Sequence, residues 1–491
     1  MNSKRHDNGM RRLCFILSAA LDTFAMLSCV ASGIRVESPF ASGERVVFFG
    51  DSITHIGRYI QYIQLWEGLR HPGSGALFMN CGVGGNTAGQ ALRRFDADLL
   101  PMKPDRVFVM FGMNDVGRGN YATATPTEEQ SSARMKSLSE FARNMATIAD
   151  RLASVNISTA FMTPTPYDQY TKSKGECLVE CNEPGLASCA DIVRDIAAKR
   201  GLELVELHRP MTGMFKGNLD FRFCPDRVHP GKEGHLVIAA HILKAIGATP
   251  LVAQAAVDAS SLTVLDVDNA VVTNVARSVS GVSFTYAPRS LPFPTLPEYM
   301  TVENNGLFPL TDTINREEIS VVGLEAGEYE LVFDGKVVAR FSADELAGGV
   351  NVATLDTENQ RRAQKAARPM TELVELVRVL RNHQLVVGMT RNAGIPESDH
   401  ARMDGHLDKW LESTKTSPHY STFCAFVEDY RKVRADRAEM MTQVERLRKA
   451  MSSERPASEQ VEVRRLVESQ LEQQVLISEH DDMNENEDPS I

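Results

Sequence analysis

The stretch Val46-Val-Phe-Phe-Gly50-Asp51-Ser52-Ile-Thr54 is the strongest indication of the fold class, because an apolar run ends in a tight turn and leads into a helix-forming segment. A short apolar run that a turn closes predicts a buried β-strand. A strand followed by a helix is the repeating unit of parallel α/β sheets, which bind ligands at the carboxyl ends of their strands. The stretch therefore predicts an α/β fold with Ser52 at the ligand-binding end of a strand.

The same alternation of β-rich runs and amphipathic helices extends from Glu44 to about Ala248. A helix is predicted between the third and fourth runs, because eight apolar residues recur there at helical spacing. These residues would pack against the sheet. The predicted helix positions are Met135, Leu138, Phe141, Ala142, Met145, Ile148, Ala149 and Leu152. The predicted strands are Arg45–Phe49, Leu77–Met79, Arg106–Phe111, Ser158–Thr163 and Glu203–Leu207.

The remaining chain is expected to form further units, because 491 residues exceed what one hydrophobic core usually organises. We predict a small β-rich module over 250–355, with a hairpin turn at Asp334-Gly335, where Asp-Gly suits positive φ angles. A charged helical region is predicted over 356–478 and an acidic, disordered tail over 479–491. Its two apolar stripes are Met370, Leu373, Val374, Val377 and Leu380, and then Val463, Leu466, Val467 and Leu471.

The first 33 residues have the layout of a secretory signal, with basic residues, an apolar stretch from Leu13 to Leu21, and small residues from Cys29 to Gly33. We expect residues 1–33 to be a signal peptide or N-terminal anchor and the protein to be exported, whether periplasmic, at the cell surface or secreted. An uncleaved anchor and a lipid attached at Cys29 remain alternatives, although Asp22 interrupts the apolar run. Membrane contact is expected only in those two cases.

The net charge argues against one class of binding partner, and the cysteines indicate possible disulfides or a zinc site. A formal net charge of -11 argues against nucleic acid, which is bound mainly through clustered Lys and Arg. In an oxidising compartment, four cysteines in a loop-rich stretch can form two disulfides in any of three pairings, and a zinc site is the alternative. These cysteines are Cys177, Cys181, Cys189 and Cys224.

Four sequence elements carry candidate chemistry, each with a plainer alternative. Ser52 could be a nucleophile, although Asp51 and Ser52 could simply cap a helix. In Asn80-Cys-Gly-Val-Gly-Gly85-Asn-Thr87 the Gly85 N–H could bind an oxyanion, although glycines also suit an ordinary turn. Asn114, in Phe111-Gly-Met-Asn114-Asp115, could donate its amide to the same oxyanion, although Asn and Asp also favour turns.

The fourth element is Asp226-Arg-Val-His229-Pro230. A carboxylate three residues before a histidine can orient the ring, which could then take the proton of Ser52. The alternative is a loop salt bridge or a surface histidine, since the chain also has His208, His235 and His241. Four such elements in this order, three of them at successive strand ends, favour catalysis over four unrelated turns.

Together, Gly50-Asp51-Ser52, Gly85, Gly112-x-Asn114-Asp115 and Asp226-x-x-His229 resemble the four sequence blocks of the SGNH (GDSL-like lipase/acylhydrolase) family, with Ile53 where the family name has Leu. The resemblance covers about residues 44–248, and the C-terminal extension is similar to that of large exported bacterial members. It implies a flavodoxin-like three-layer α/β/α fold, a Ser-His-Asp triad, and an oxyanion hole from the Ser52 N–H, the Gly85 N–H and the Asn114 amide. It implies no metal and no organic cofactor.

We therefore predict a serine ester hydrolase that removes short acyl groups, above all acetyl, from carbohydrates or related esters. The expected partner is a small-molecule or polysaccharide ester, and Trp66, Tyr167 or Tyr170 could stack on sugar rings or simply pack in the core. The C-terminal helices could mediate self-association. The alternatives are a lipase- or thioesterase-type acylhydrolase and a non-catalytic carbohydrate-binding or scaffold protein.

Overall fold

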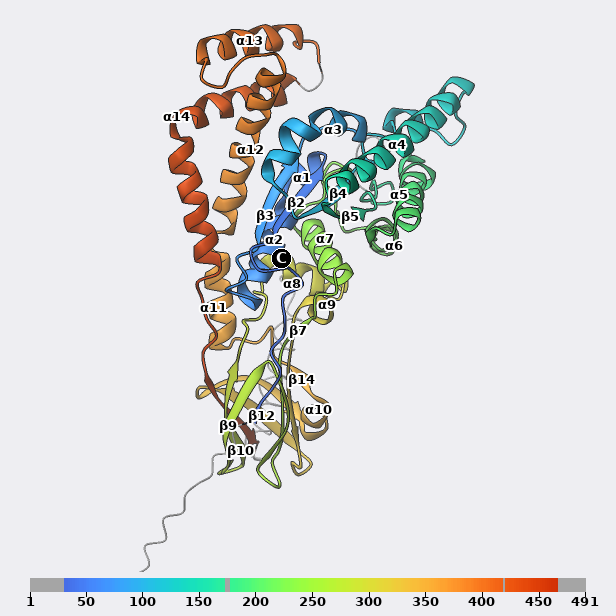
Figure 1. The fold of residues 1–491 in the computed structure, drawn as a ribbon. Coiled ribbons are helices and arrows are strands. Elements are labelled where there is room, and N and C mark those ends of the chain that lie inside the picture. Colours follow the sequence, from blue (N-terminus) through green and yellow to red (C-terminus); the bar gives the residue numbers. More distant parts are fainter. Residues whose placement is uncertain (1–30, 173–176, 418–419, 467–491) are drawn as a thin grey trace, which may run out of the picture.

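The computed structural model describes residues 31–172, 177–417 and 420–466. Figure 1 shows an α/β domain, a β-rich unit below it, and a long pair of helices that runs beside the α/β domain. Of the predicted signal region, residues 1–33, the first 30 lie outside the described residues, as does the predicted acidic tail, whereas Ala31–Ser32 form strand β1. In the part of the chain that is described, no helix is both long and apolar enough to cross a bilayer.

The α/β domain has a five-stranded sheet in which every pairing is parallel. The strand order is β3-β2-β4-β5-β6, so the first strand along the chain lies between the second and the third. This is the flavodoxin-like order, and its switch point lies where the chain first turns back across the sheet, beside β2. The predicted fold class is confirmed. The strands are β2 (Arg45–Gly50), β3 (Leu77–Gly82), β4 (Arg106–Met110), β5 (Ser158–Met162) and β6 (Glu203–Val205).

Helices cover both faces of this sheet, and two consecutive residues of β2 show how. Phe48 packs edge-on against Tyr59 of α2, which in turn stacks on His235 of α7. Phe49 points to the opposite face, because side chains alternate along a strand, and contacts Phe95 beyond α3. The sheet is therefore the middle of three layers. The main helices are α2 (Arg58–Arg70), α3 (Ala88–Arg94), α4 (Glu128–Ser154), α5 (Ala187–Arg200) and α7 (Lys232–Ala245).

Helix α4 is the helix predicted between the third and fourth strands, and it begins at a capping box made by Thr127 and Gln130. Phe141, Met145 and Leu152 are buried against the sheet as expected, but the prediction is wrong at Met135, which is 68% exposed. A helix of 27 residues is about 40 Å long, whereas a five-residue strand spans about 17 Å. The first turns of α4 therefore extend beyond the sheet (Figure 1).

The β-rich unit consists of two sheets whose inner faces share one apolar core, with residues from both sheets in the same cluster. The predicted hairpin is present, since Phe333 pairs with Lys336 and the φ angles are 47° at Asp334 and 81° at Gly335. One sheet is β14 (Val350–Asn351), β11 (Arg316–Val322), β7 (Leu251–Asp258) and β8 (Thr263–Asp268). The other is β1 (Ala31–Ser32), β9 (Ala270–Ser278), β10 (Gly281–Pro288), β15 (Glu459–Arg465), β12 (Glu328–Phe333) and β13 (Lys336–Ser342).

Strand β15 contradicts the helix predicted around Val463 and Leu466. It lies between β10 and β12 and pairs antiparallel with both. Val461 and Val463 are fully buried while Glu462 between them is only partly buried, which is the two-residue period of a strand. This strand pattern covers fewer residues than the helical stripe that it overlaps, so the helical pattern was the stronger signal. Val467 and Leu471 lie outside the described residues.

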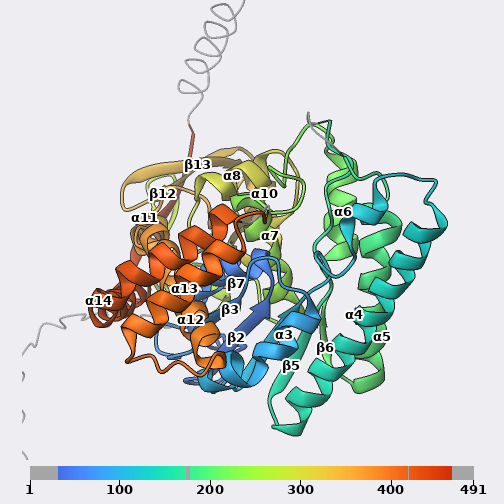
Figure 2. The ribbon, with the colours of Figure 1, turned by 90° about the horizontal axis from the view of Figure 1, so that it is seen from above.

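The helical region runs between β14 and β15, and α14 ends before Pro456, as expected of a helix-breaking residue. Helices α12 and α14 lie side by side, and α13 crosses their far end (Figures 1 and 2). The division of the chain into separately folding domains stays a prediction. These helices are α11 (Glu358–Ala367), α12 (Met370–Asn392), α13 (His400–Ser413) and α14 (Tyr420–Met451). The short elements are α1 (Ser52–Ile56), η1 (Phe95–Leu99), η2 (Leu100–Met102), η3 (Arg118–Tyr121), η4 (Cys181–Leu186), α6 (His208–Gly217), α8 (Pro297–Asn304), α9 (Leu310–Ile314) and α10 (Ala343–Gly348).

Candidate active site

Ser52 is the first residue of α1, directly beyond the carboxyl end of β2. The capping alternative holds for its neighbour, because the Asp51 side chain accepts a hydrogen bond of 3.0 Å from the Ile53 N–H. The Ser52 hydroxyl is thereby left for another contact, and its Oγ lies 2.8 Å from Nε2 of His229. Two residues 177 positions apart in the sequence thus meet at the edge of the sheet.

The ring of His229 is held on its other side by Asp226, whose Oδ2 lies 2.6 Å from Nδ1. The second oxygen of Asp226 accepts backbone hydrogen bonds from Val228 and His229, at 3.0 and 2.7 Å. Burial opposes ionisation of Asp226, but these hydrogen bonds outweigh burial and lower its pKa. An ionised carboxylate only accepts hydrogen bonds, so Nδ1 is the donor to Asp226, and Nε2 is the ring nitrogen that faces the serine hydroxyl.

Arg227 shapes the loop between these two residues, a role that no pattern in the sequence indicated. It adopts a positive φ of 68° and its side chain is buried. Its Nη1 donates to the Asp168 carbonyl at 2.8 Å, while its own carbonyl accepts from the Asp168 N–H at 2.8 Å. These contacts tie the loop to the segment after β5 and fix where Asp226 and His229 project.

Gly85 and Asn114 flank Ser52, because β3 and β4, the strands that precede them, lie on either side of β2. The Asn114 amide donates to the Asn86 carbonyl at 3.0 Å, so it joins the loop that carries Gly85. Arg118 donates to the Asn114 side-chain oxygen at 3.4 Å, which orients the amide with its nitrogen towards that loop. Gly85 has a φ of 73°, a conformation that favours glycine.

Two buried carboxyl groups support these turns rather than face outward. Asp115 accepts from the Ala88 N–H at 2.8 Å and from the Gly112 N–H at 3.1 Å, and it so links the turn after β4 to the start of α3. Burial raises the pKa of Asp115 to about 6 and that of Asp51 to about 7. This role of Asp115 was not predicted, because the backbone groups that it binds are not visible in a pattern of side chains.

His208, His235 and the tryptophan that could have stacked on a sugar ring are buried and take part in packing. His208 is buried with Nε2 3.0 Å from the Asn182 side-chain oxygen, and His235 is buried against Tyr59. Trp66 is also buried, donating to the Ile314 carbonyl at 3.3 Å, so it has no surface for a sugar ring. The four clustered cysteines are free thiols here, and in the described ranges no group of three or more His, Cys, Asp or Glu side chains could hold a metal ion.

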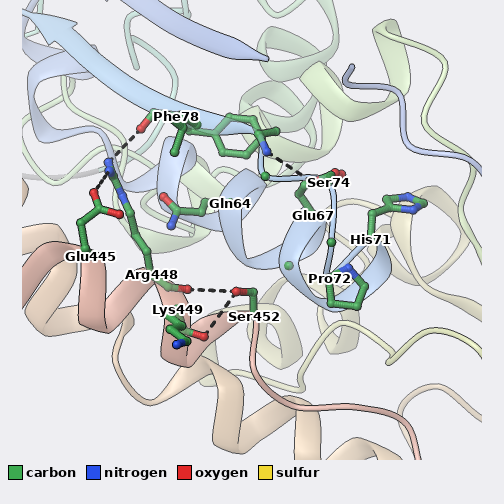
Figure 3. Close-up of a pocket in the computed structure, with 15 residues that line it drawn as sticks. Gln64, Glu67, His71, Pro72, Ser74, Phe78, Glu445, Arg448, Lys449 and Ser452 are labelled. Carbon is green, nitrogen blue, oxygen red and sulfur yellow. Dashed lines mark hydrogen bonds and ion pairs between the residues drawn. The ribbon is translucent and has the colours of Figure 1, made fainter. Parts of the chain in front are cut away.

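A pocket of about 320 Å³ lies elsewhere, between the end of α2, the start of β3 and the last turns of α14. Figure 3 shows Glu67 and His71 on one side of it and Arg448 on the other. Leu77 and Phe78 line it at the amino end of β3, whereas Ser52 follows the carboxyl end of the neighbouring parallel strand. The pocket is therefore at the opposite end of the sheet and is separate from the site around Ser52.

Comparison with known proteins defines the class to which this arrangement belongs. Residues 48–237 match the GDSL-like Lipase/Acylhydrolase family, and the chain is a carboxylic ester hydrolase. This matched range contains all four sequence blocks on which the predicted resemblance rested.

Individual relatives cover different parts of the chain. An acetylxylan esterase of Geobacillus stearothermophilus is 26% identical over 226 residues, which are 42% of this chain and 95% of that protein. An uncharacterized lipoprotein of Bacillus subtilis (strain 168) is 42% identical over 78 residues, 15% of this chain and 32% of that protein. The solved structure of a gut microbial diltiazem-metabolizing enzyme has a TM-score of 0.75 at 23% identity, covering 88% of this chain and 100% of that one. This last likeness shows that the fold extends through the β-rich and helical regions.

Proposed function

We propose that this protein hydrolyses short acyl esters, above all acetyl esters of carbohydrates, with Ser52 as nucleophile, His229 as general base and Asp226 as the residue that orients the histidine. The observation that carries the proposal is the continuous line of contacts from Asp226 Oδ2 to His229 Nδ1 at 2.6 Å and from His229 Nε2 to Ser52 Oγ at 2.8 Å. Both distances are within hydrogen-bond reach, as general-base activation of a serine requires.

In the first half of the reaction, Ser52 Oγ attacks the ester carbonyl while its proton passes to Nε2 of His229. The ionised Asp226 stabilises the resulting imidazolium and keeps it in the productive orientation. His229 then gives the proton to the leaving alcohol, and the carbonyl re-forms as an acyl group on Ser52. In the second half, water attacks this acyl group with His229 again as base, releasing the acid and restoring the serine.

The negative charge of both tetrahedral states falls on the former carbonyl oxygen, for which we propose three donors. The Ser52 N–H, in the first turn of α1, has no acceptor within its helix. The Gly85 N–H comes from the loop on one side of Ser52, and the Asn114 amide has a second N–H besides the one bound to Asn86. Each such donor typically contributes about 3 kcal/mol to the stability of the transition state.

The proposed acyl group and alcohol rest on similarity rather than on geometry. The relative that aligns over 95% of its length is an acetylxylan esterase, which supports a short acyl group on a carbohydrate. A lipase- or thioesterase-type preference predicts a different chain-length profile, and a non-catalytic scaffold predicts no turnover at all. Export stays a proposal as well, supported by the short similarity to a lipoprotein.

The decisive experiment combines turnover with labelling of the nucleophile. We expect p-nitrophenyl acetate to be hydrolysed faster than the octanoate, acetylated xylan to release acetate, and an organophosphonate to add once, at Ser52. Ser52→Ala should lower kcat at least ~1000-fold and abolish the adduct while the thermal unfolding curve stays unchanged. Ser188→Ala is the matched control, since that hydroxyl only donates to the Pro184 carbonyl. A folded Ser52→Ala protein with wild-type turnover would refute the assignment.

A further inference from the structure

A buried arginine from the helical region reaches the strand end beside Ser52. Arg381 lies in the middle of α12, and its side chain is only 1% exposed. Its Nε donates to the carbonyl of Gly82 at 3.0 Å, and its two terminal nitrogens contact the two oxygens of Asp98 at 2.6 and 2.5 Å. Seen from above in Figure 2, α12 lies alongside β3, which ends at Gly82. A residue 299 positions away in sequence thus holds the end of this strand.

Asp98 is shared with a second guanidinium, that of Arg94, at 2.7 Å. Arg94 also donates to the carbonyls of Cys81 and Gly50, at 3.0 and 3.1 Å, and to the side-chain oxygen of Asn86 at 2.8 Å. One carboxylate with two guanidiniums therefore connects the last residues of β2 and β3 with the loop that follows β3.

The cluster is ionised and rigid. Burial alone would raise the pKa of Asp98, but Arg381 and Arg94 outweigh it and hold that pKa well below its usual range. A two-point contact between a planar guanidinium and a carboxylate fixes the relative orientation of both groups. Breaking such a buried pair is costly, because one charge is left without its partner.

Further contacts restrain the loop from Gly82 to Asn86 at both of its ends. A Cβ at position 82 would come within 2.2 Å of the His55 nitrogen, so the strand end is packed directly against α1. On the far side of the loop, the Asn86 carbonyl accepts from the Asn114 amide. The helical region adds a second contact at this edge, where Phe426 of α14 stacks on His55 at 5.7 Å.

We propose that Arg381 is a positioning residue for ester hydrolysis: through Gly82 and Asp98 it fixes the Gly82–Asn86 loop, and with it the Gly85 N–H and the acceptor of the Asn114 amide, where the oxyanion forms. The inference rests on the proposed roles of Gly85 and Asn114. It assigns the helical region a part in the active site although Arg381 lies outside residues 48–237, over which the family matches. Displacing such a loop by about 1 Å is expected to slow the chemical step up to about 100-fold.

The test measures kcat and KM for p-nitrophenyl acetate, and the rate of organophosphonate addition to Ser52, in full-length Arg381→Gln, Arg381→Lys and Asn86→Ala. For Arg381→Gln we expect kcat and the labelling rate to fall together by about 10–100-fold, with KM within about twofold of wild type. Arg381→Lys keeps the positive charge but cannot make the two-point contact with Asp98, so its kcat should lie between those of Arg381→Gln and wild type. Asn86→Ala removes the Arg94 contact from a partly exposed residue and should also lower kcat with little change in KM.

Arg378→Gln is the control, because Arg378 lies one turn away on α12 and pairs with Glu375 and Asp429 instead of the loop. Its kcat should equal that of wild type. Folded Arg381→Gln protein with wild-type kcat and labelling rate would overturn the positioning role and leave the esterase assignment intact. If Arg381→Gln does not fold, unchanged kcat in Asn86→Ala overturns the role of the cluster. A wild-type protein that neither turns over nor labels at Ser52 overturns both.

Discussion

The α/β domain and the β-rich unit are assembled in different ways from the same chain. All five strands of the parallel sheet come from one continuous stretch, 45–205, and each short strand is followed by its own helix or turn. The β-rich unit collects strands from three separate stretches, 31–32, 251–351 and 459–465. The helical region is therefore an insertion within the β-rich unit, with a strand of that unit at each of its ends, rather than a C-terminal tail.

The two units also differ in where they keep polar side chains. The α/β domain gathers them at the carboxyl ends of its strands, where Ser52, His229 and Asp226 are in contact. The β-rich unit buries acidic groups in its interior instead. Glu317 accepts from the Tyr286 hydroxyl at 3.1 Å, and burial, reinforced by nearby Glu459, raises the pKa of Glu317 to about 8. The α/β domain buries acids too, such as Asp51 and Asp115, but its strand ends also hold the contacts of Ser52, His229 and Asp226, whereas Glu317 and Glu459 are enclosed in the β-rich unit.

The largest effect that we expect is on the stability of the β-rich unit when β15 is disrupted. Val463 is fully buried between Val282 and Leu331 on the two neighbouring strands, so Val463→Asp places an unpaired charge in the shared core. We expect a loss of several kcal/mol and an early unfolding transition of the β-rich unit in calorimetry. Below that transition kcat should fall no more than about tenfold, since the α/β domain is continuous without β15.

Val337→Asp is the matched control for that substitution, because Val337 is exposed on β13. It should leave the unfolding profile unchanged within about 0.5 kcal/mol. A Val463→Asp protein that unfolds like wild type would contradict the view that β15 closes the unit.

The next largest effect is on catalysis at the strand ends of the α/β domain. Asn114→Ala removes one proposed oxyanion donor and should lower kcat by about 100–1000-fold with little change in KM. Steady-state kinetics with p-nitrophenyl acetate would measure both constants. Asn305→Ala is the control, because that exposed amide only donates to the Thr301 carbonyl at the end of α8. Equal kcat in both variants would remove Asn114 from the proposed site.

The smallest effect concerns the acid enclosed by the β-rich unit. The pKa of Glu317 in the folded state, about 8, lies above its ordinary value of 4.5, so the folded protein retains a proton that the unfolded chain releases. Its contribution to stability is therefore complete below about pH 4.5 and is lost as the pH rises through about 8. Glu317→Gln is neutral throughout this window, and its melting temperature should fall between pH 5 and 8.5 by at least about 2 °C less than that of wild type.

The control for this prediction is Glu318→Gln, on the next residue of β11, where the carboxylate pairs with Arg316. It should keep the wild-type pH dependence of melting. The other buried acids, such as Asp51 and Asp115, are present in all three proteins, so the difference reports on Glu317 together with its interaction with Glu459. Parallel curves for wild type and Glu317→Gln would show that this carboxyl group does not retain its proton.

Much of the α/β domain was predictable because its signals are local. The apolar run before Gly50 marks a strand by itself, and Asp334-Gly335 marks a hairpin by its own φ preferences. The Asp226-x-x-His229 spacing, taken with the turn at Ser52, also predicted the contact of Ser52 with His229. These inferences needed no knowledge of what packs against each segment.

The missed features depend on partners far away in sequence. Residues 459–465 form a strand only because β10 and β12 leave a gap for it, and no local pattern records that gap. Trp66 was a candidate for sugar stacking until the Ile314 carbonyl and the core around it were known. Arg381 lies in a segment that was predicted only as helical and charged, and only its contacts with Gly82 and Asp98 show why it is buried.

The central place of β15 has a consequence for synthesis of the protein on the ribosome. All five strands of the α/β domain have been made once residue 205 has emerged, although its apolar core also takes side chains from later segments, such as Met370 and Leu373 of α12. Strands β10 and β12 must then wait, with open hydrogen-bonding edges, until residues 459–465 have been made. Open edges are templates for pairing between chains, so this interval is when a nascent chain is most exposed to aggregation.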